Sequence, residues 1–298
     1  MKTPIRHVAM IVLALLSIPA CAATTEDKYA TLAGVKIRYI DVGKGEPIVL
    51  LHGGGSNLDT WVTSGVVANL SKDFRVIAFD ARGHGKSDAP HDPKAYGREQ
   101  ALDVVRLLDA LKLKRAHIVG FSLGGSTTSQ LLTLHPERVL TATLVGGPGR
   151  YPWTPKEEQR VEEEASEIAK ECISRSRMFR QAPAGAKPSE DDIRKRSDEC
   201  RANKDFDQRA TAASLRGYKD QALTEDQLKS VKVPTLLVVG DLDHTLEANR
   251  NLKRLRPDAT LVIVEGASHT GARGIQRNPQ LVTAIREYVG RHGAAGAY

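Results

Sequence analysis

The chain has 298 residues, 41% of them hydrophobic, and this length favours one large α/β domain with an insertion over two independent domains. Its formal net charge is +7, but Lys and Arg are interleaved with Glu and Asp and form no long run of one sign. This pattern is typical of a solvated surface of mixed charge, so we expect no nucleic-acid partner.

The N-terminus resembles a secretory signal. Basic residues precede an apolar run over 8–18, and a small-residue cleavage site ends at Ala22. The run is too short to span a membrane. We therefore predict a signal peptide over residues 1–22 and a periplasmic or secreted protein. The segment that ends at Cys21 also loosely resembles a lipoprotein box, which would leave Cys21 lipidated at the mature N-terminus.

The other two cysteines are Cys172 and Cys200. In an exported chain they would meet an oxidising compartment, and because they form an even pair we predict a disulfide between them. The bridge would close a loop of roughly thirty residues and add about 3 to 4 kcal/mol to stability. Two free buried thiols are the alternative.

Short apolar runs alternate with helical patterns along the chain. From the third run onward they are apolar throughout, as expected when helices cover both faces of a mostly parallel sheet. We therefore predict an α/β fold with a mostly parallel sheet flanked by helices. The expected strands are 35–41, 47–52, 74–80, 117–121, 141–145, 235–240 and 259–264, and the expected helices include 97–111, 122–135 and 278–292.

A long, charged segment without a strand-like run separates the last two strands from the others. We predict that residues 148–232 form a helical cap, and that 23–147 and 233–298 form the core domain. No internal repeat is evident.

Two helix starts are visible within the predicted cap. Thr154, followed by a proline and by Glu157, matches a T-x-x-E capping box. Ser189, with Asp192 three residues on, marks a second start. The predicted disulfide would join the two helices that begin at these positions.

Ser122 lies between two glycines, after an apolar run and before a helix-compatible run. In such a strand-turn-helix context, Gly120 and Gly124 have a steric reason to lack Cβ, and the Ser122 hydroxyl points outward. The start of the following helix would stabilise negative charge beside that hydroxyl. This pattern predicts a nucleophile elbow.

The chain offers partners for Ser122 in the order that catalysis requires. His269 follows the strand 259–264 and is the predicted general base. Asp243 follows the strand 235–240 and is the predicted orienting acid, with Asp241 as the second choice. His244 is a distant alternative base.

Glycines after the strand 47–52 predict the oxyanion donors. His52 is followed by three glycines, whose backbone could supply one N–H, and the helix start supplies another. We predict Gly54 and Leu123 as these donors, and we expect His52 to brace the loop rather than to transfer protons.

With these motifs, the chain resembles an α/β-hydrolase-fold serine hydrolase over about residues 30 to 290. The resemblance includes a D-x-R-G-H-G-x-S segment at 80–87 and an H-P-E-R-V turn at 135–139. It implies nucleophile, acid and histidine in the order Ser122, Asp243 and His269, and it implies that the segment around Asp80 shapes a turn. The serine at the elbow implies acyl transfer to water, because relatives with other chemistries carry aspartate or cysteine there.

These features predict an exported hydrolase that cleaves a carboxylic ester in a small-molecule acyl substrate. An amide or peptide, a lactone or a carbon–carbon bond remain as alternative substrates, and a non-catalytic ligand-binding protein is the alternative from another class. No cofactor is implied, and the His and acidic residues lack a metal-binding spacing.

Overall fold

The computed structural model describes residues 25–182, 187–204 and 206–293. The predicted signal peptide, residues 1–22, and Cys21 lie outside the described residues. Within the described ranges, no helix has the length and apolar character needed to cross a membrane.

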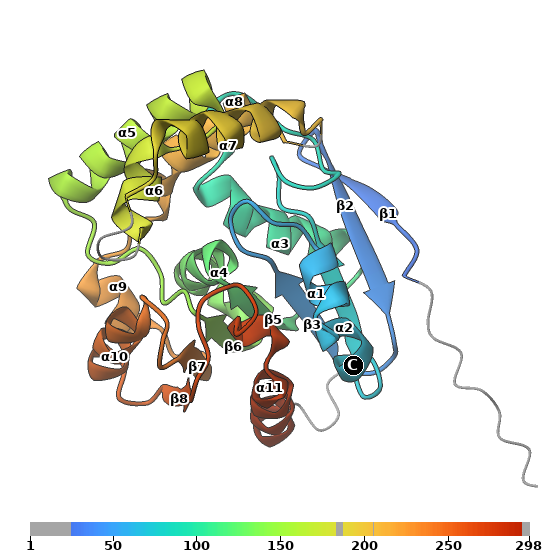
Figure 1. The fold of residues 1–298 in the computed structure, drawn as a ribbon. Coiled ribbons are helices and arrows are strands. Elements are labelled where there is room, and N and C mark those ends of the chain that lie inside the picture. Colours follow the sequence, from blue (N-terminus) through green and yellow to red (C-terminus); the bar gives the residue numbers. More distant parts are fainter. Residues whose placement is uncertain (1–24, 183–186, 205, 294–298) are drawn as a thin grey trace, which may run out of the picture.

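An eight-stranded sheet forms the centre of the molecule, in the order β1-β2-β4-β3-β5-β6-β7-β8 (Figure 1). The first two strands are antiparallel to their neighbours, and the other six run parallel to one another. The strands are β1 (Lys28–Leu32), β2 (Val35–Val42), β3 (Pro47–Leu51), β4 (Arg75–Phe79), β5 (Ala116–Phe121), β6 (Val139–Val145), β7 (Thr235–Gly240) and β8 (Thr260–Val264).

The predicted fold class is confirmed, and each predicted strand is present. The sequence did not predict β1. Its five residues mix charged, polar and apolar side chains, and most are exposed at the edge of the sheet, so they form no apolar run.

Helices cover both faces of the sheet, and β3 shows how the faces are divided. Ile48 and Leu50 pack into a core beneath α1 (Asp59–Thr63), α2 (Val66–Leu70) and α11 (Pro279–His292). Val49 and Leu51 point to the other face, where they pack into a core with α3 (Arg98–Ala110) and α4 (Leu123–Leu134). This alternation is the two-residue period of a strand with both faces buried.

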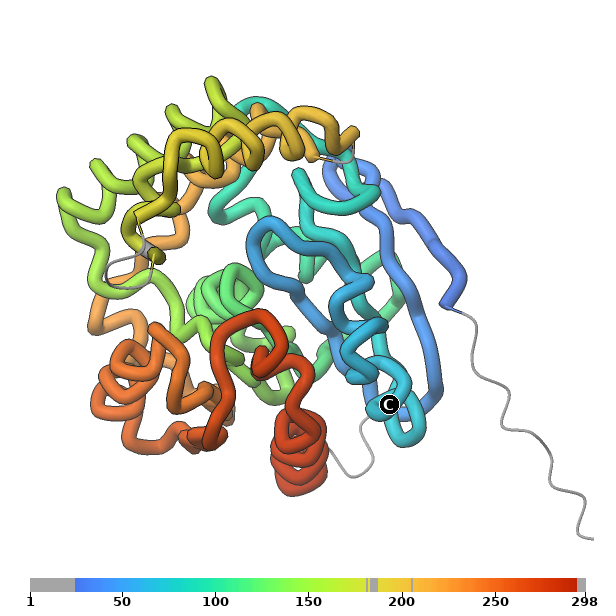
Figure 2. The backbone as a smooth tube through the Cα atoms, in the orientation of Figure 1, coloured from blue at the N-terminus to red at the C-terminus, as the bar shows by residue number. Residues whose placement is uncertain are grey.

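Further helices lie between β6 and β7 in the chain and form a layer over the carboxyl ends of the strands (Figures 1 and 2). They are α5 (Pro155–Glu171), α6 (Arg175–Gln181), α7 (Glu190–Ala202) and α8 (Gln208–Arg216). The chain returns through η3 (Gly217–Gln221) to α9 (Glu225–Ser230), which contacts α4 and α10 (Leu246–Leu255). Short 3₁₀ turns complete the elements: η1 (Pro93–Ala95), η2 (Pro136–Arg138) and η4 (Ile275–Arg277).

The starts of α5 and α7 agree with the sequence in part. Ser189 and Asp192 form the complete capping box at α7. At α5, Thr154 accepts a hydrogen bond from the Glu157 backbone, but the predicted return bond is wrong, because the Glu157 carboxylate binds Arg160 instead. An ion pair with an arginine three residues further along the helix competes successfully for the carboxylate that a capping box needs.

The predicted disulfide is confirmed in the structure. Cys172, at the end of α5, is bonded to Cys200 in α7, and their Cα atoms are 5.9 Å apart. The hydrophobic cluster of this layer is small and includes Val161 and Ile168 of α5 and Leu215 of α8. The disulfide therefore supplements a limited core.

Candidate active site

Ser122 occupies a sharp turn between β5 and α4. Its backbone has φ +51° and ψ −107°, which a residue with a Cβ rarely adopts. The turn brings backbone segments so close that a Cβ on Gly120 would lie 2.2 Å from the Gly124 carbonyl oxygen, and one on Gly124 would lie 2.4 Å from the Leu51 carbonyl oxygen. These contacts require glycine at both positions and hold the Ser122 side chain at the carboxyl edge of the sheet.

The loops after β5, β7 and β8 bring Ser122, Asp243 and His269 together. His269 Nε2 lies 3.0 Å from Ser122 Oγ, and His269 Nδ1 lies 2.8 Å from Asp243 Oδ2. Because a carboxylate can only accept, Nδ1 carries the proton and Nε2 is the acceptor that faces the Ser122 hydroxyl. This is the arrangement of a base that can remove the serine proton.

Asp243 is fixed by hydrogen bonds on both carboxylate oxygens. It is 4% exposed, and its Oδ1 accepts bonds of 2.8 Å from both the backbone and the hydroxyl of Thr245. Burial alone would raise the pKa of Asp243, but the hydrogen bonds from His269 and Thr245 outweigh it and hold the pKa below its usual value. The Asp241 side chain is exposed and takes no part in these bonds.

His244 lies beside His269 rather than in its place. Its ring centroid is 4.5 Å from that of His269, in an edge-on arrangement, and it is exposed. His269 itself holds the bond to Ser122, so His244 is not placed to act as the base.

Asp243, His244 and His269 also bring potential metal-ligand atoms within 4.8 Å of one another, but a cation there would displace the proton that orients His269.

The glycine loop after β3 lies directly against the elbow. A Cβ on Gly53 would come 3.4 Å from Ser122 Cβ, and one on Gly54 would come 3.8 Å from Leu123 Cβ. The Leu123 N–H belongs to the first turn of α4 and has no acceptor within that helix. Gly54 and Leu123 are therefore neighbours beside the Ser122 side chain.

His52 braces this loop. Its Nε2 is 3.0 Å from the Ala81 backbone nitrogen and must accept, so Nδ1 carries the proton and donates to the Gly53 carbonyl oxygen at 2.8 Å. Burial lowers the pKa of His52 to about 4, which keeps the ring neutral at pH 7. The side chain therefore connects the loop after β3 to the turn after β4.

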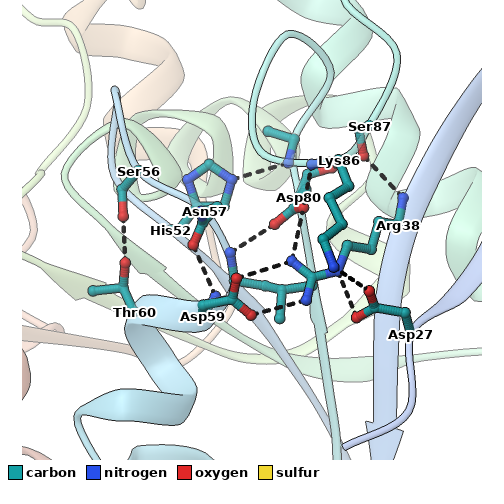
Figure 3. Close-up of polar contacts among 12 residues, drawn as sticks. Asp27, Arg38, His52, Ser56, Asn57, Asp59, Thr60, Asp80, Lys86 and Ser87 are labelled. Carbon is teal, nitrogen blue, oxygen red and sulfur yellow. Dashed lines mark hydrogen bonds and ion pairs between the residues drawn. The ribbon is translucent and has the colours of Figure 1, made fainter. Parts of the chain in front are cut away.

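Asp80 and Arg38 hold the same turn from the other side (Figure 3). Asp80 is fully buried and accepts from the backbone N–H groups of Leu58 and Lys86 at 2.7 and 2.8 Å. Arg38 Nη1 lies 3.3 Å from Asp80 and 3.1 Å from Asp59. This arrangement agrees with the expectation that the segment around Asp80 shapes a turn.

A small cavity lies behind the elbow. It is lined by Leu51, His52, Phe79, Ala81, Gln100, Asp103, Leu123, Gly124 and Thr127. Ser122 and His269 are not among these residues, so we do not assign the cavity to the substrate.

Sequence reasoning missed two features of the site. Gly146 lies so close to the base that a Cβ on it would come 3.1 Å from His269 Nδ1. Tyr218, in η3, places its hydroxyl 3.4 Å from the Cβ position of Gly54. The double glycine that directly follows β6 was a visible signal for the first feature, whereas no local pattern marks the second.

Comparison with known proteins identifies the family. A family model described as alpha/beta hydrolase fold matches residues 46–272. The 2-hydroxymuconate semialdehyde hydrolase of Pseudomonas sp. (strain CF600) is 39% identical over 119 residues, which are 39% of this chain and 42% of that protein. The chain spans less than half the length of the curated relatives that it matches first.

Longer matches exist at lower identity. A putative 2-succinyl-6-hydroxy-2,4-cyclohexadiene-1-carboxylate synthase of Bacillus subtilis (strain 168) is 26% identical over 80% of this chain and 89% of its own length. Among solved structures, the enol-lactonase from Burkholderia xenovorans LB400 is 28% identical, covers 88% of this chain and 100% of its own, and superposes with a TM-score of 0.65.

Proposed function

Because the chain belongs to the alpha/beta hydrolase fold family, we propose that it is a hydrolase that cleaves a carboxylic ester through Ser122, His269 and Asp243. The observation that supports this proposal is the continuous hydrogen-bonded chain from Ser122 Oγ through both nitrogens of His269 to Asp243. In this arrangement each residue has a separate chemical role.

The reaction proceeds in two acyl transfers. His269 Nε2 takes the proton of Ser122 as Oγ attacks the ester carbonyl, and it then gives that proton to the departing alcohol. Water attacks the acyl-enzyme with the same base and releases the acid and free Ser122. Asp243 holds the Nδ1 proton and stabilises the imidazolium in both steps. The N–H groups of Gly54 and Leu123 stabilise the oxyanion.

A lactone is the second candidate substrate. The similarity to an enol-lactonase over most of both chains favours it, and a lactone is an ester within a ring, so the same steps apply. Amides, peptides and carbon–carbon bonds remain alternatives on the same catalytic groups. A ligand-binding protein without turnover is the alternative from another class, and the intact hydrogen-bonded chain argues against it.

We also propose that the protein is exported. The N-terminal pattern over residues 1–22 supports this, and so does the disulfide of Cys172 with Cys200, because such bonds persist in oxidising compartments. The mass of the protein recovered from the periplasm or medium would give the cleavage site directly. An unprocessed N-terminus would exclude a cleaved signal.

The test of the proposed activity is hydrolysis of p-nitrophenyl esters of increasing acyl length, with Ser122→Ala as the matched variant. Wild-type turnover and its loss in Ser122→Ala are expected, because removal of the nucleophile costs orders of magnitude in rate. Retained activity in Ser122→Ala would overturn the mechanism. If no ester is cleaved, labelling of Ser122 by an organophosphonate would point to the other bond types, and absence of labelling would favour the binding protein.

A further inference from the structure

Arg150 lies at the end of the segment that leaves β6 beside the elbow. Gly147, within this segment, contacts the elbow so closely that a Cβ there would come 2.3 Å from the Ser122 carbonyl oxygen. Arg150 itself pairs with Ala222 in an isolated parallel bridge. It is thus held between the core and the chain that returns from the helical layer.

The guanidinium of Arg150 is oriented by a buried amide. Its Nε donates to Gln221 Oε1 at 2.9 Å, and Gln221 is fully buried. Gln221 is in turn fixed, because its Nε2 donates to Gln100 Oε1 at 3.1 Å and to Thr127 Oγ1 at 3.2 Å. The Arg150 guanidinium is therefore positioned in advance, and the bond to Gln221 uses its Nε and neither of its Nη groups.

No carboxylate of the described residues forms an ion pair with Arg150. Every other arginine of those residues that is not exposed forms at least one ion pair. The charged groups on α5 that influence Arg150 are Glu157 and Arg160, and these two pair with each other. Burial lowers the pKa of Arg150, and this effect outweighs the opposing effects of the Tyr218 hydroxyl and of the Glu157 carboxylate.

A tyrosine connects this cation to the reaction centre. The Arg150 Cζ lies 3.3 Å from the centroid of the Tyr218 ring, in a cation–π contact. At its other end, the Tyr218 hydroxyl lies 3.4 Å from the Cβ position of Gly54, next to the predicted oxyanion donors. The positive charge therefore lies one aromatic ring away from the place where the ester carbonyl would sit.

We propose that Arg150 binds a carboxylate on the acyl part of the substrate, so that the enzyme prefers half-esters or lactones of dicarboxylic acids over neutral esters. This inference rests on the proposed hydrolase function. The acyl part becomes bonded to Ser122 in the first step and is released by water in the second, so one anchor at Arg150 would orient it for both steps. A bidentate bond from a guanidinium to a carboxylate is the strongest contact available to such a side chain.

The test compares two esters of equal length, p-nitrophenyl glutarate, which carries a terminal carboxylate, and p-nitrophenyl valerate, which does not. Wild type is expected to prefer the glutarate ester in kcat/KM. Arg150→Met keeps much of the stem and removes the charge, and it should lower kcat/KM for the glutarate ester about 10- to 100-fold more than for the valerate ester, mainly through KM. Arg150→Lys should restore part of the preference.

The control is Arg209→Met, which removes the same charge from an exposed position on α8 and should keep the preference. Equal hydrolysis of both esters by wild type, with Ser122→Ala inactive, would overturn the role of Arg150 and leave the hydrolase function in place. If neither ester is cleaved, calorimetry measures the affinity of Ser122→Ala for each ester. Tighter binding of the glutarate ester, lost when Arg150→Met is added to Ser122→Ala, supports the proposal. Equal affinities for the two esters overturn it.

Discussion

Gly146 lies against the His269 imidazole, and a Cβ on this glycine would come 3.1 Å from Nδ1 and 3.0 Å from Asp243 Oδ2. Its φ of +56° is itself a conformation that favours glycine. The backbone at the end of β6 therefore forms one wall of the space in which His269 and Asp243 meet. An added methyl group can fit only if one of these side chains moves.

Gly146→Ala is expected to lower kcat, but by less than the roughly 100-fold that a displacement of about 1 Å costs a catalytic group, because the added Cβ requires a shift of only a few tenths of an ångström. Hydrolysis of the best p-nitrophenyl ester measures the effect. Gly34→Ala is the matched control, since Gly34 also has positive φ (+82°) but nothing within 4 Å of its Cβ position. Both variants should lose about 1 to 2 kcal/mol of stability from the backbone conformation. An equal kcat for Gly146→Ala and Gly34→Ala would show that Gly146 does not limit the position of His269.

Asp243→Asn is expected to reduce kcat about 10⁴-fold, as replacement of the acid does in a comparable triad, because an amide no longer fixes the proton on His269 Nδ1. Asp241→Asn should leave kcat/KM essentially unchanged, since the Asp241 carboxylate is exposed and outside the hydrogen-bonded chain. Steady-state kinetics of the two variants, with circular dichroism to verify folding, decide between the two carboxylates. A larger loss in Asp241→Asn would reverse the assignment of the acid.

The features that could be predicted from the sequence are those that depend on residues close together in the chain. The inner parallel strands β3, β4, β5, β6 and β7 are buried almost throughout, so each is a visible apolar run. β8 lies at an edge and is largely not buried, but its residues are still mostly apolar, whereas the residues of the other edge strand, β1, are not. Ser122 was found because its turn excludes Cβ at two fixed positions, and this steric rule leaves a pattern within five residues.

The features that sequence missed depend on how distant segments pack. Tyr218 reaches Gly54 only because η3 returns from the helical layer above the glycine loop, and no local pattern encodes that approach. Arg150 is notable only once the ion pairs of the other arginines are known. The capping box predicted at Thr154 is incomplete because Arg160, in the second turn of α5, binds the carboxylate of Glu157.

Replacement of both cysteines, Cys172→Ser with Cys200→Ser, is expected to lower stability by about 3 to 4 kcal/mol, because the bridge closes a loop with a sequence separation of 28. Thermal denaturation with and without dithiothreitol measures it. Reductant should lower the Tm of wild type and leave that of the double variant unchanged. Labelling of both cysteines by iodoacetamide in unreduced, denatured wild type would contradict the bridge.

His52 is expected to make stability fall as the pH is lowered. The side chain is 2% exposed, and burial lowers its pKa to about 4, below the ordinary value near 6.5. Between these values the unfolded chain binds a proton that the folded chain does not, so this contribution is complete above about pH 6.5 and is lost as the pH falls toward 4. The full loss is up to about 3 kcal/mol.

Urea denaturation of wild type and His52→Gln from pH 4 to 8 measures the free energy of unfolding of each protein. The difference between the two isolates the contribution of His52, because both proteins have the same carboxylates. His52→Gln should be the less stable protein at pH 8, because it loses the bonds to Ala81 and Gly53. The gap between the two free energies of unfolding should then narrow below about pH 6.5, since glutamine binds no proton in the unfolded state. A gap that stays constant over the whole range would mean that His52 titrates alike in the folded and unfolded chains, and that the loop after β3 is open to water.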